Sequence, residues 1–228
     1  LFEIRIVIFG FMIWNKYNLQ VNDWDGLLMR KFMEHGKRGG TFCDVGACNG
    51  LFTGIFKSLA GPDGMVYSFE MNPNNYANVK NQSAPNCIVE NKAVSDGPGR
   101  VPIYAENKLA SNFTSNIMGH SGRVIGEVES VSLDEYFAGK QVDYLKIDVE
   151  GAEGKVIRGG IATLKKAKYV IVECHHEKDW QEIFDMLASN DLKFKNLVDD
   201  EPVAIGTRAV VPGIMGNGMP YQMHLVQP

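Results

Sequence analysis

The sequence TFCDVGACNG, residues 41–50, is a short apolar run that passes directly into a turn with two glycines. Residues 41–45 predict a buried strand, and residues 51–60 predict a helix that the following Gly61-Pro62 ends. Glycines at a strand-to-helix turn let the backbone approach a ligand closely, and the next helix presents its N-terminal amides to that ligand. Residues 41–60 therefore predict a ligand-binding strand–turn–helix unit.

The rest of the chain alternates strand-like and helix-like stretches in the same way. Further strands are expected at residues 65–69, 87–94, 144–149 and 169–174, with an edge strand at 101–105 and tail strands at 193–197, 203–205 and 223–226. Further helices are expected at residues 22–37, 74–82, 133–137, 153–158 and 179–189. Buried strands that alternate with helices predict a doubly wound, mostly parallel α/β sheet. Ligands bind such sheets at the carboxyl ends of the strands.

Length and composition favour a single domain, because 228 residues with 45% hydrophobic content suit one α/β core. We expect residues 1–40 to form a strand or helix extension packed on the core, and residues 41–228 to form the ligand-binding domain. The apolar N-terminus contains Glu3 and Arg5 and is too short to span a bilayer, so a membrane partner is not expected. The polar stretch 108–123 is expected to be a loop over the substrate.

Charge and cysteine content narrow the class of partner and compartment. The net charge of −4, with no basic stripe, argues against nucleic acid as a substrate. The four cysteines lack the spacing of a zinc site or a CxxC pair. Cys43 and Cys174 lie in apolar runs, where a free thiol behaves as a small hydrophobe. These features favour a reduced, cytoplasmic setting.

The turn after the first strand favours one kind of cofactor. A dinucleotide fingerprint needs a middle glycine where Cys48 stands, so a nicotinamide-dependent oxidoreductase is disfavoured. Asp44, just before Gly46, can attract the cationic amino-acid end of S-adenosylmethionine. Glu70 follows the second strand, where a carboxylate can accept both ribose hydroxyls. Alone, Asp44 could be a helix cap and Glu70 a solvent-facing strand end, but their joint placement points to S-adenosylmethionine.

A second group of polar residues follows the strands at 144–149 and 169–174. Adjacent parallel strands are expected to bring these residues to one rim: Asp148, Glu150, Glu153, Glu173 and His175. Carboxylates and an imidazole beside a cofactor site are costly unless they are paired, solvated or used in the chemistry. Lys146 is expected to form an ion pair with a neighbouring acid, and Glu153 could simply begin the next helix.

Five segments of the chain resemble the FkbM-type methyltransferases: DVGACNG at 44–50, SFEMNP at 68–73, NKAVSD at 91–96, LKIDVEGAE at 145–153 and IVECHH at 171–176. The resemblance implies a Rossmann-like class I methyltransferase with a seven-stranded sheet and a C-terminal antiparallel hairpin. It also implies methyl transfer from S-adenosylmethionine to a hydroxyl of a sugar, glycan or related natural product. By this match the cofactor would be held by Asp44, Gly46, Asn49 and Gly50 at its methionine end, Glu70 at the ribose, and Asn91 and Ala93 beside the adenine.

The expected reaction is in-line displacement, in which the acceptor oxygen attacks the methyl carbon and loses its proton to a base. Asp148 and His175 are the candidate bases, with Glu173 a further catalytic candidate. A divalent metal held by Asp148, Glu150 and Glu173 is an alternative, because hard cations bind carboxylate oxygens. Two other functions stay open: an N-methyltransferase acting on a small molecule or protein, and a non-catalytic cofactor-binding module.

Overall fold

The computed structural model describes residues 23–105, 115–119, 122–175, 177–192, 194–196 and 221–226. The chain divides into two compact units, Leu1–Glu34 and His35–Pro228. Helix α2 (Asp23–His35) belongs to the first unit except for its last residue, and it matches the helix expected at 22–37. Residues 1–22 and the expected strand at 203–205 lie outside the described residues, so the packing of the N-terminal extension stays a prediction. None of the helices that the structure describes is long and apolar enough to cross a membrane.

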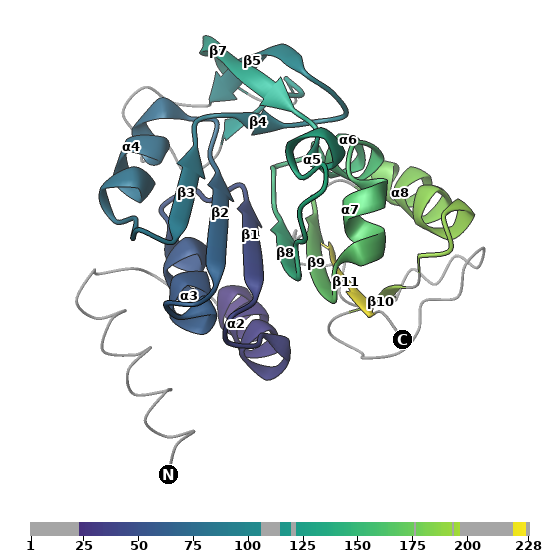
Figure 1. Cartoon of the computed structure of the whole chain (residues 1–228). Helices are drawn as coiled ribbons and strands as arrows, with labels where there is room; N and C mark the ends of the chain where they lie inside the picture. The colour runs from purple at the N-terminus through teal and green to yellow at the C-terminus, as the bar shows by residue number, and fades with distance from the viewer. Residues whose placement is uncertain are drawn as a thin grey trace. The chain divides into compact units, whose positions relative to one another are not determined.

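The second unit is built on a sheet with the strand order β10-β11-β9-β8-β1-β2-β3 (Figure 1). Its strands are β1 (Thr41–Val45), β2 (Met65–Phe69), β3 (Cys87–Glu90), β8 (Tyr144–Ile147), β9 (Tyr169–Cys174), β10 (Phe194–Asn196) and β11 (Tyr221–Val226). Strand β11 runs antiparallel to β9 and β10, and the other neighbouring strands of this sheet are parallel. The prediction of a mostly parallel α/β sheet is confirmed.

The centre of the sheet is buried on both faces. All four residues of β8 are buried, as are five of the six residues of β9. Strand β1 has β2 on one side and β8 on the other, because the chain builds outward through β2 and β3 before returning to the far side of β1. Such a reversal of strand order is the point at which open α/β sheets bind their ligands. The carboxyl ends of β1, β2, β8 and β9 therefore define the place to look for a site.

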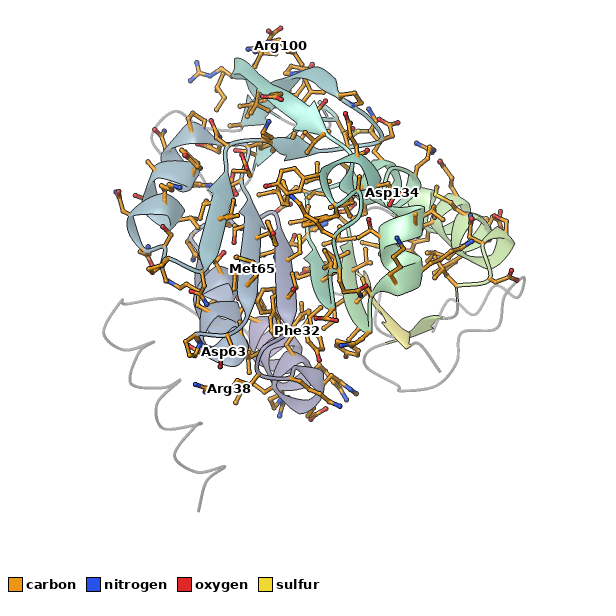
Figure 2. The ribbon with its side chains drawn as sticks, in the orientation of Figure 1. Phe32, Arg38, Asp63, Met65, Arg100 and Asp134 are labelled. Atoms are coloured by element: carbon orange, nitrogen blue, oxygen red, sulfur yellow. The ribbon has the colours of Figure 1, made fainter. Side chains whose placement is uncertain are left out.

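Helices connect the strands of the main sheet. They are α3 (Leu51–Ala60), α4 (Pro73–Asn81), α5 (Leu133–Tyr136), α6 (Glu153–Arg158), α7 (Ile161–Lys166) and α8 (Glu177–Ser189). Helix α3 packs on β1 and β2, and α6 packs on β9 and α8. The sequence did not predict α7, whose first turn is held by Asp134: the Asp134 carboxylate accepts hydrogen bonds from the Ala162 and Thr163 amides (Figure 2). That cap comes from 28 residues away and leaves no local signal.

A second sheet lies between β3 and β8 in the sequence, with the order β4-β7-β5-β6 (Figure 1). Its strands are β4 (Ala93–Val94), β5 (Gly99–Ala105), β6 (Ser115–Asn116) and β7 (Arg123–Val131). The prediction of one strand over 87–94 is wrong, because the Asn91 side chain donates to the Glu70 and Met71 carbonyls between β3 and β4. The strand expected at 101–105 is β5, but it lies between β7 and β6 and not at an edge, and its partner β7 was not predicted. Most of the expected loop at 108–123 lies outside the described residues, and its described part is not all loop, because Ser115–Asn116 form β6.

Strand β7 escaped prediction because its first half is solvent-exposed. Val124 and Ile125 are 54% and 40% exposed. This half of the strand therefore lacks the alternation of buried apolar and exposed polar residues that predicts a strand. Arg100 of β5 forms an exposed ion pair with Glu127 of β7 (Figure 2). None of the four cysteines, all of which the structure describes, forms a disulfide, and Cys43, Cys87 and Cys174 are buried.

Candidate active site

The turn after β1 lies directly against the chain that follows β8. Gly46 has φ +83°, and a Cβ at this position would lie 1.7 Å from the Asp148 carbonyl oxygen. The Gly46 and Ala47 amides both donate to the Phe69 carbonyl at 3.0 Å, which ties the turn to the end of β2. Gly50, with φ +85°, ends the turn just before α3. A glycine is therefore required at position 46 by both backbone conformation and space.

Glu70 closes the other side of this turn. One carboxylate oxygen accepts a hydrogen bond from the Cys48 amide at 2.7 Å, and the other accepts one from the Asn72 amide at 2.8 Å. Burial raises the pKa of Glu70 to about 7, although these two amides and Lys146 oppose the shift. Each carboxylate oxygen can still accept another hydrogen bond, so the pair fits the two hydroxyls of a ribose.

A buried charge network lies beneath the turn. Asp44 is fully buried, accepts a hydrogen bond from the Thr53 hydroxyl at 2.7 Å, and lies 3.6 Å from the Lys146 ammonium. That ammonium lies 3.0 Å from Asp148 and donates to the Gly46 carbonyl at 3.3 Å. Burial raises the pKa of Asp44, and Lys146 offsets part of this shift. Burial would lower the pKa of Lys146, but the charges of Asp148 and Asp44 raise it above its ordinary value. The prediction that Lys146 pairs with an acid is confirmed.

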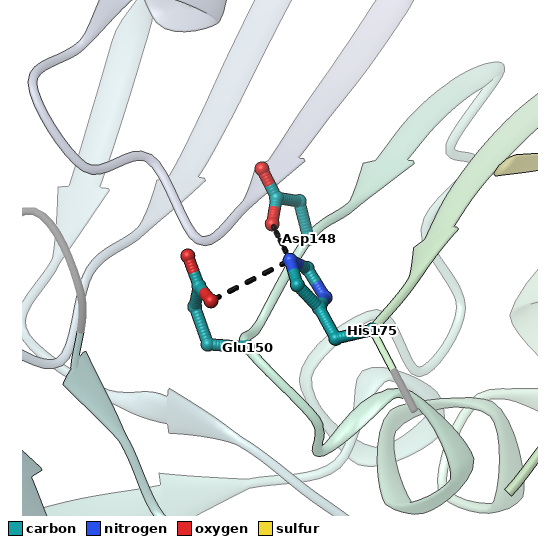
Figure 3. A group of neighbouring side chains, drawn as sticks. All are labelled: Asp148, Glu150 and His175. Carbon is teal, nitrogen blue, oxygen red and sulfur yellow. Dashed lines mark ion pairs between the residues drawn. The ribbon is translucent and has the colours of Figure 1, made fainter. Parts of the chain in front are cut away.

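Asp148 and Glu150 after β8 meet His175 after β9 (Figure 3). The His175 Nε2 atom lies 3.7 Å from Asp148 Oδ1 and 3.5 Å from Glu150 Oε2. On the other side of the ring, Nδ1 lies 2.8 Å from Glu153, a buried carboxylate at the first position of α6. We call Asp148, Glu150, Glu153 and His175 the carboxylate rim. Burial would lower the pKa of His175, but the hydrogen bond and charge of Glu153, with Asp148 and Glu150, raise it to about 9.

The structure brings together four of the five residues predicted to form one rim. Glu173 belongs to β9, and its charge acts on Lys146. In the part of the chain that the structure describes, the donor atoms that converge within 4.8 Å belong to Asp148, Glu150 and His175, whereas the predicted metal set had Glu173 in place of His175. His175 lies beyond its strand end, as Asp148 and Glu150 do, while Glu173 lies within its strand.

Two features of the site were not predicted. Glu153 does begin a helix, as expected, but its contact with His175 depends on how α6 packs against β9 and has no signal in the sequence. The place of Asn91 beside the adenine stays a prediction, and the feature not predicted is that its side-chain amide donates to the Glu70 and Met71 carbonyls. Asn91 therefore fixes the backbone around Glu70.

The fold, the switch point and the turn after β1 define a class I methyltransferase-like protein. Residues 44–195 match the Methyltransferase FkbM domain, which covers most of the chain. The chain belongs to the FkbM methyltransferase family, as its sequence motifs predicted, and it is an enzyme of the methyltransferase class.

Individual relatives agree with this assignment. Hexuronic acid methyltransferase AglP of Haloferax volcanii is 25% identical over 186 residues, which cover 79% of this chain and 76% of AglP. The crystal structure of methyltransferase FkbM from Methylobacillus flagellatus has a TM-score of 0.55 at 11% identity, over 86% of this chain and 50% of its own length. A SAM-dependent O-methyltransferase from Thermotoga maritima has a TM-score of 0.51 at 13% identity, over 95% and 70% of the two chains. This chain thus spans half the length of the M. flagellatus protein, and these two structures support the fold alone.

Proposed function

We propose that this protein transfers a methyl group from S-adenosylmethionine to a hydroxyl of a sugar, a glycan or a related natural product. The observation that carries the proposal is the contact of Gly46 with the Asp148 carbonyl, which leaves no room for a side chain between them. A cofactor held by the turn after β1 would then lie beside an acceptor held by the carboxylate rim. Direct transfer requires that proximity, since the reacting atoms must be about 3–3.5 Å apart.

We propose that residues 41–228 form the cofactor-binding domain, with residues 1–40 as its extension and the antiparallel β10–β11 pair as the C-terminal hairpin of the fold. The proposed cofactor residues are Asp44, Gly46, Asn49, Gly50, Glu70, Asn91 and Ala93. Glu70 would accept the ribose hydroxyls, for which its two oxygens have the capacity. Asp44 is fully buried, so it would act on the methionine end through its negative potential and its hold on Thr53.

When bound, S-adenosylmethionine supplies a methyl group already made electrophilic by its sulfonium. The acceptor oxygen would form the new bond to the methyl carbon as the sulfur–methyl bond breaks toward sulfur, and the carboxylate rim would take the hydroxyl proton. Asp148, Glu173 and His175 are the proposed catalytic residues, of which Asp148 is fixed by Lys146 at 3.0 Å. A base fixed in this way would hold the acceptor oxygen in line with the sulfur–methyl bond.

The proposed acceptor class rests on a relative and on the rim itself. The 25% identical AglP is named for a hexuronic acid, which carries several hydroxyls and one carboxyl. Partly exposed carboxylates such as Asp148 and Glu150 accept hydrogen bonds from sugar hydroxyls. An amine acceptor would also suit an acidic rim, so the chemical identity of the methylated product must distinguish a hydroxyl acceptor from an amine acceptor.

The test is methyl transfer from tritiated S-adenosylmethionine to a panel of uronic-acid oligosaccharides, neutral oligosaccharides and amines. We expect label on a sugar as an ether, which survives mild alkali, and a loss of about 10²–10⁴-fold in Asp148→Asn. The exposed Glu127→Gln should transfer at the wild-type rate. An alkali-labile ester, a methylated amine, or no transfer to any hydroxylated acceptor would contradict the proposal.

A further inference from the structure

The three donor atoms of Asp148, Glu150 and His175 have the spacing of metal ligands. They lie within 4.8 Å of one another, and Nε2 of His175 is 3.5 and 3.7 Å from the two carboxylate oxygens. These separations exceed the usual hydrogen-bond length of about 2.7–3.2 Å. They are close to the separation of about 3 Å between neighbouring ligands of an octahedral ion whose bonds are about 2.1 Å long.

The ring of His175 is oriented by a partner outside this set. Nδ1 lies 2.8 Å from the carboxylate of Glu153, whose residue is only 2% exposed and which also accepts the Gly151 amide at 3.0 Å. Glu153 is thus held by the chain that follows β8, and it holds His175 with Nε2 facing Asp148 and Glu150. A carboxylate on the far nitrogen of a histidine is the usual second partner of a metal-binding imidazole.

Asp148 is oriented from the opposite side. Its Oδ2 atom lies 3.0 Å from the Lys146 ammonium, which leaves Oδ1 toward His175. The side chains of Asp148, Glu150 and His175 are 27%, 35% and 17% exposed. A cation could therefore enter from solvent and keep positions for water or for an acceptor. The three rim carboxylates also outnumber the two basic side chains, Lys146 and His175, that contact them.

We propose that Asp148, Glu150 and His175 bind a divalent cation of the Mg²⁺ or Mn²⁺ class. Two carboxylate oxygens favour hard cations such as Mg²⁺ and Mn²⁺, and the imidazole nitrogen binds a transition-metal ion more readily than Mg²⁺. The proposal that these residues bind the ion does not depend on the proposed reaction. Its role in holding the hydroxyls of the acceptor beside the methyl group rests on the proposed function.

The test is a titration of the metal-stripped full chain with Mn²⁺, in which the electron paramagnetic resonance signal of the free ion disappears on binding. We expect one saturable site per chain, from which Mg²⁺ displaces Mn²⁺. Glu150→Gln and His175→Gln should each weaken the site, and Glu153→Gln should weaken it by about 10–100-fold through the imidazole. Glu127→Gln, an exposed carboxylate of β7, should bind Mn²⁺ as the wild type does.

A titration of the same samples with S-adenosylhomocysteine separates this proposal from the proposed function. Binding of S-adenosylhomocysteine by folded protein with no saturable Mn²⁺ site would overturn the metal proposal alone. So would a Mn²⁺ site that survives in both Glu150→Gln and His175→Gln. A Mn²⁺ site in a folded protein that binds no S-adenosylhomocysteine would overturn the proposed function and leave the metal site standing.

Discussion

The same edge of the main sheet carries two groups of residues, each with at least two carboxylates, in opposite environments. At the ends of β1 and β2, Asp44 and Glu70 are buried and hold the turn between β1 and α3. At the ends of β8 and β9, Asp148, Glu150 and His175 are partly exposed. A buried carboxylate that accepts hydrogen bonds from backbone amides, as Glu70 does, or from a buried hydroxyl, as Asp44 does, is a fixed part of the binding surface. An exposed carboxylate can exchange water for a ligand. The first group is therefore a permanent part of the site, and the second group makes contacts that can be exchanged.

Lys146 joins the two groups, and its removal has the largest expected effect on stability. Lys146→Met leaves the negative charges of Asp44 and Asp148 without their buried cation. Loss of one partner from a buried ion pair costs about 3–5 kcal/mol, which urea unfolding should detect. The double variant Lys146→Met with Asp44→Asn should recover part of the loss. If the two changes were additive, Lys146 would not couple Asp44 to the rim.

A substitution at the contact between the two groups, where Gly46 meets the Asp148 carbonyl, should destabilise the protein nearly as much. Gly46→Ala places a Cβ 1.7 Å from the Asp148 carbonyl at a backbone φ of +83°, so the turn must move away from β8. Strain and overpacking together should lower the free energy of unfolding by about 2–4 kcal/mol. Gly54→Ala is the matched control in α3, where an added Cβ meets nothing within 4 Å. It should stabilise the protein by about 0.5–1 kcal/mol, and equal effects of the two changes would refute the close contact.

The raised pKa of Glu70 predicts that the first group responds to pH in the neutral range. Because burial raises this pKa to about 7, the carboxyl is neutral below that pH and ionised above it. Asp44 raises the pKa further and Lys146 lowers it, so both charges act on this titration. An ionised carboxylate accepts ribose hydroxyls more strongly, so affinity for S-adenosylhomocysteine should rise about tenfold, or about 1.4 kcal/mol, as pH rises through 7. Glu70→Gln should flatten the profile, which calorimetry at several pH values can check.

The smallest expected effect concerns an ion pair outside both groups. Lys92 and Glu129 are 2.7 Å apart, but the Glu129 side chain is 59% exposed. Glu129→Gln should therefore change the free energy of unfolding by less than about 1 kcal/mol, in contrast to Lys146→Met. Urea unfolding of both variants under the same conditions makes the comparison. A loss at Glu129 that equals the loss at Lys146 would show that burial does not set these energies.

Local sequence patterns predicted the main sheet and its helices better than the second sheet. The bounds of β1, β2, β9, α3 and α6 match the predictions, because each element is bounded by glycines or polar residues and has a clear apolar pattern. Strand β7 is exposed over its first half, and α7 takes its cap from Asp134, so neither has a strong local signal. The split between β3 and β4 depends on Asn91 bonding to carbonyls at the end of β2.

The sequence likewise predicted one part of the site and missed another. Strand ends predicted which polar residues share an edge, because the carboxyl ends of parallel strands must meet there. They did not predict that Glu153 would hold His175, or that His175 rather than Glu173 would face Asp148 and Glu150. Those contacts depend on the packing of α6 against β9, which no residue pattern encodes locally.

The most direct test of the division between the two groups is a calorimetric titration with S-adenosylhomocysteine of the wild type, Glu70→Gln and Glu150→Gln. Both changes replace one carboxylate by an amide of the same shape, one at the end of β2 and one after β8. Glu70→Gln should weaken binding, whereas Glu150→Gln should bind as the wild type does and lose about 10²-fold in methyl transfer, because the acceptor is less well positioned. Equal weakening by both changes, or no binding to the folded wild type, would contradict the account.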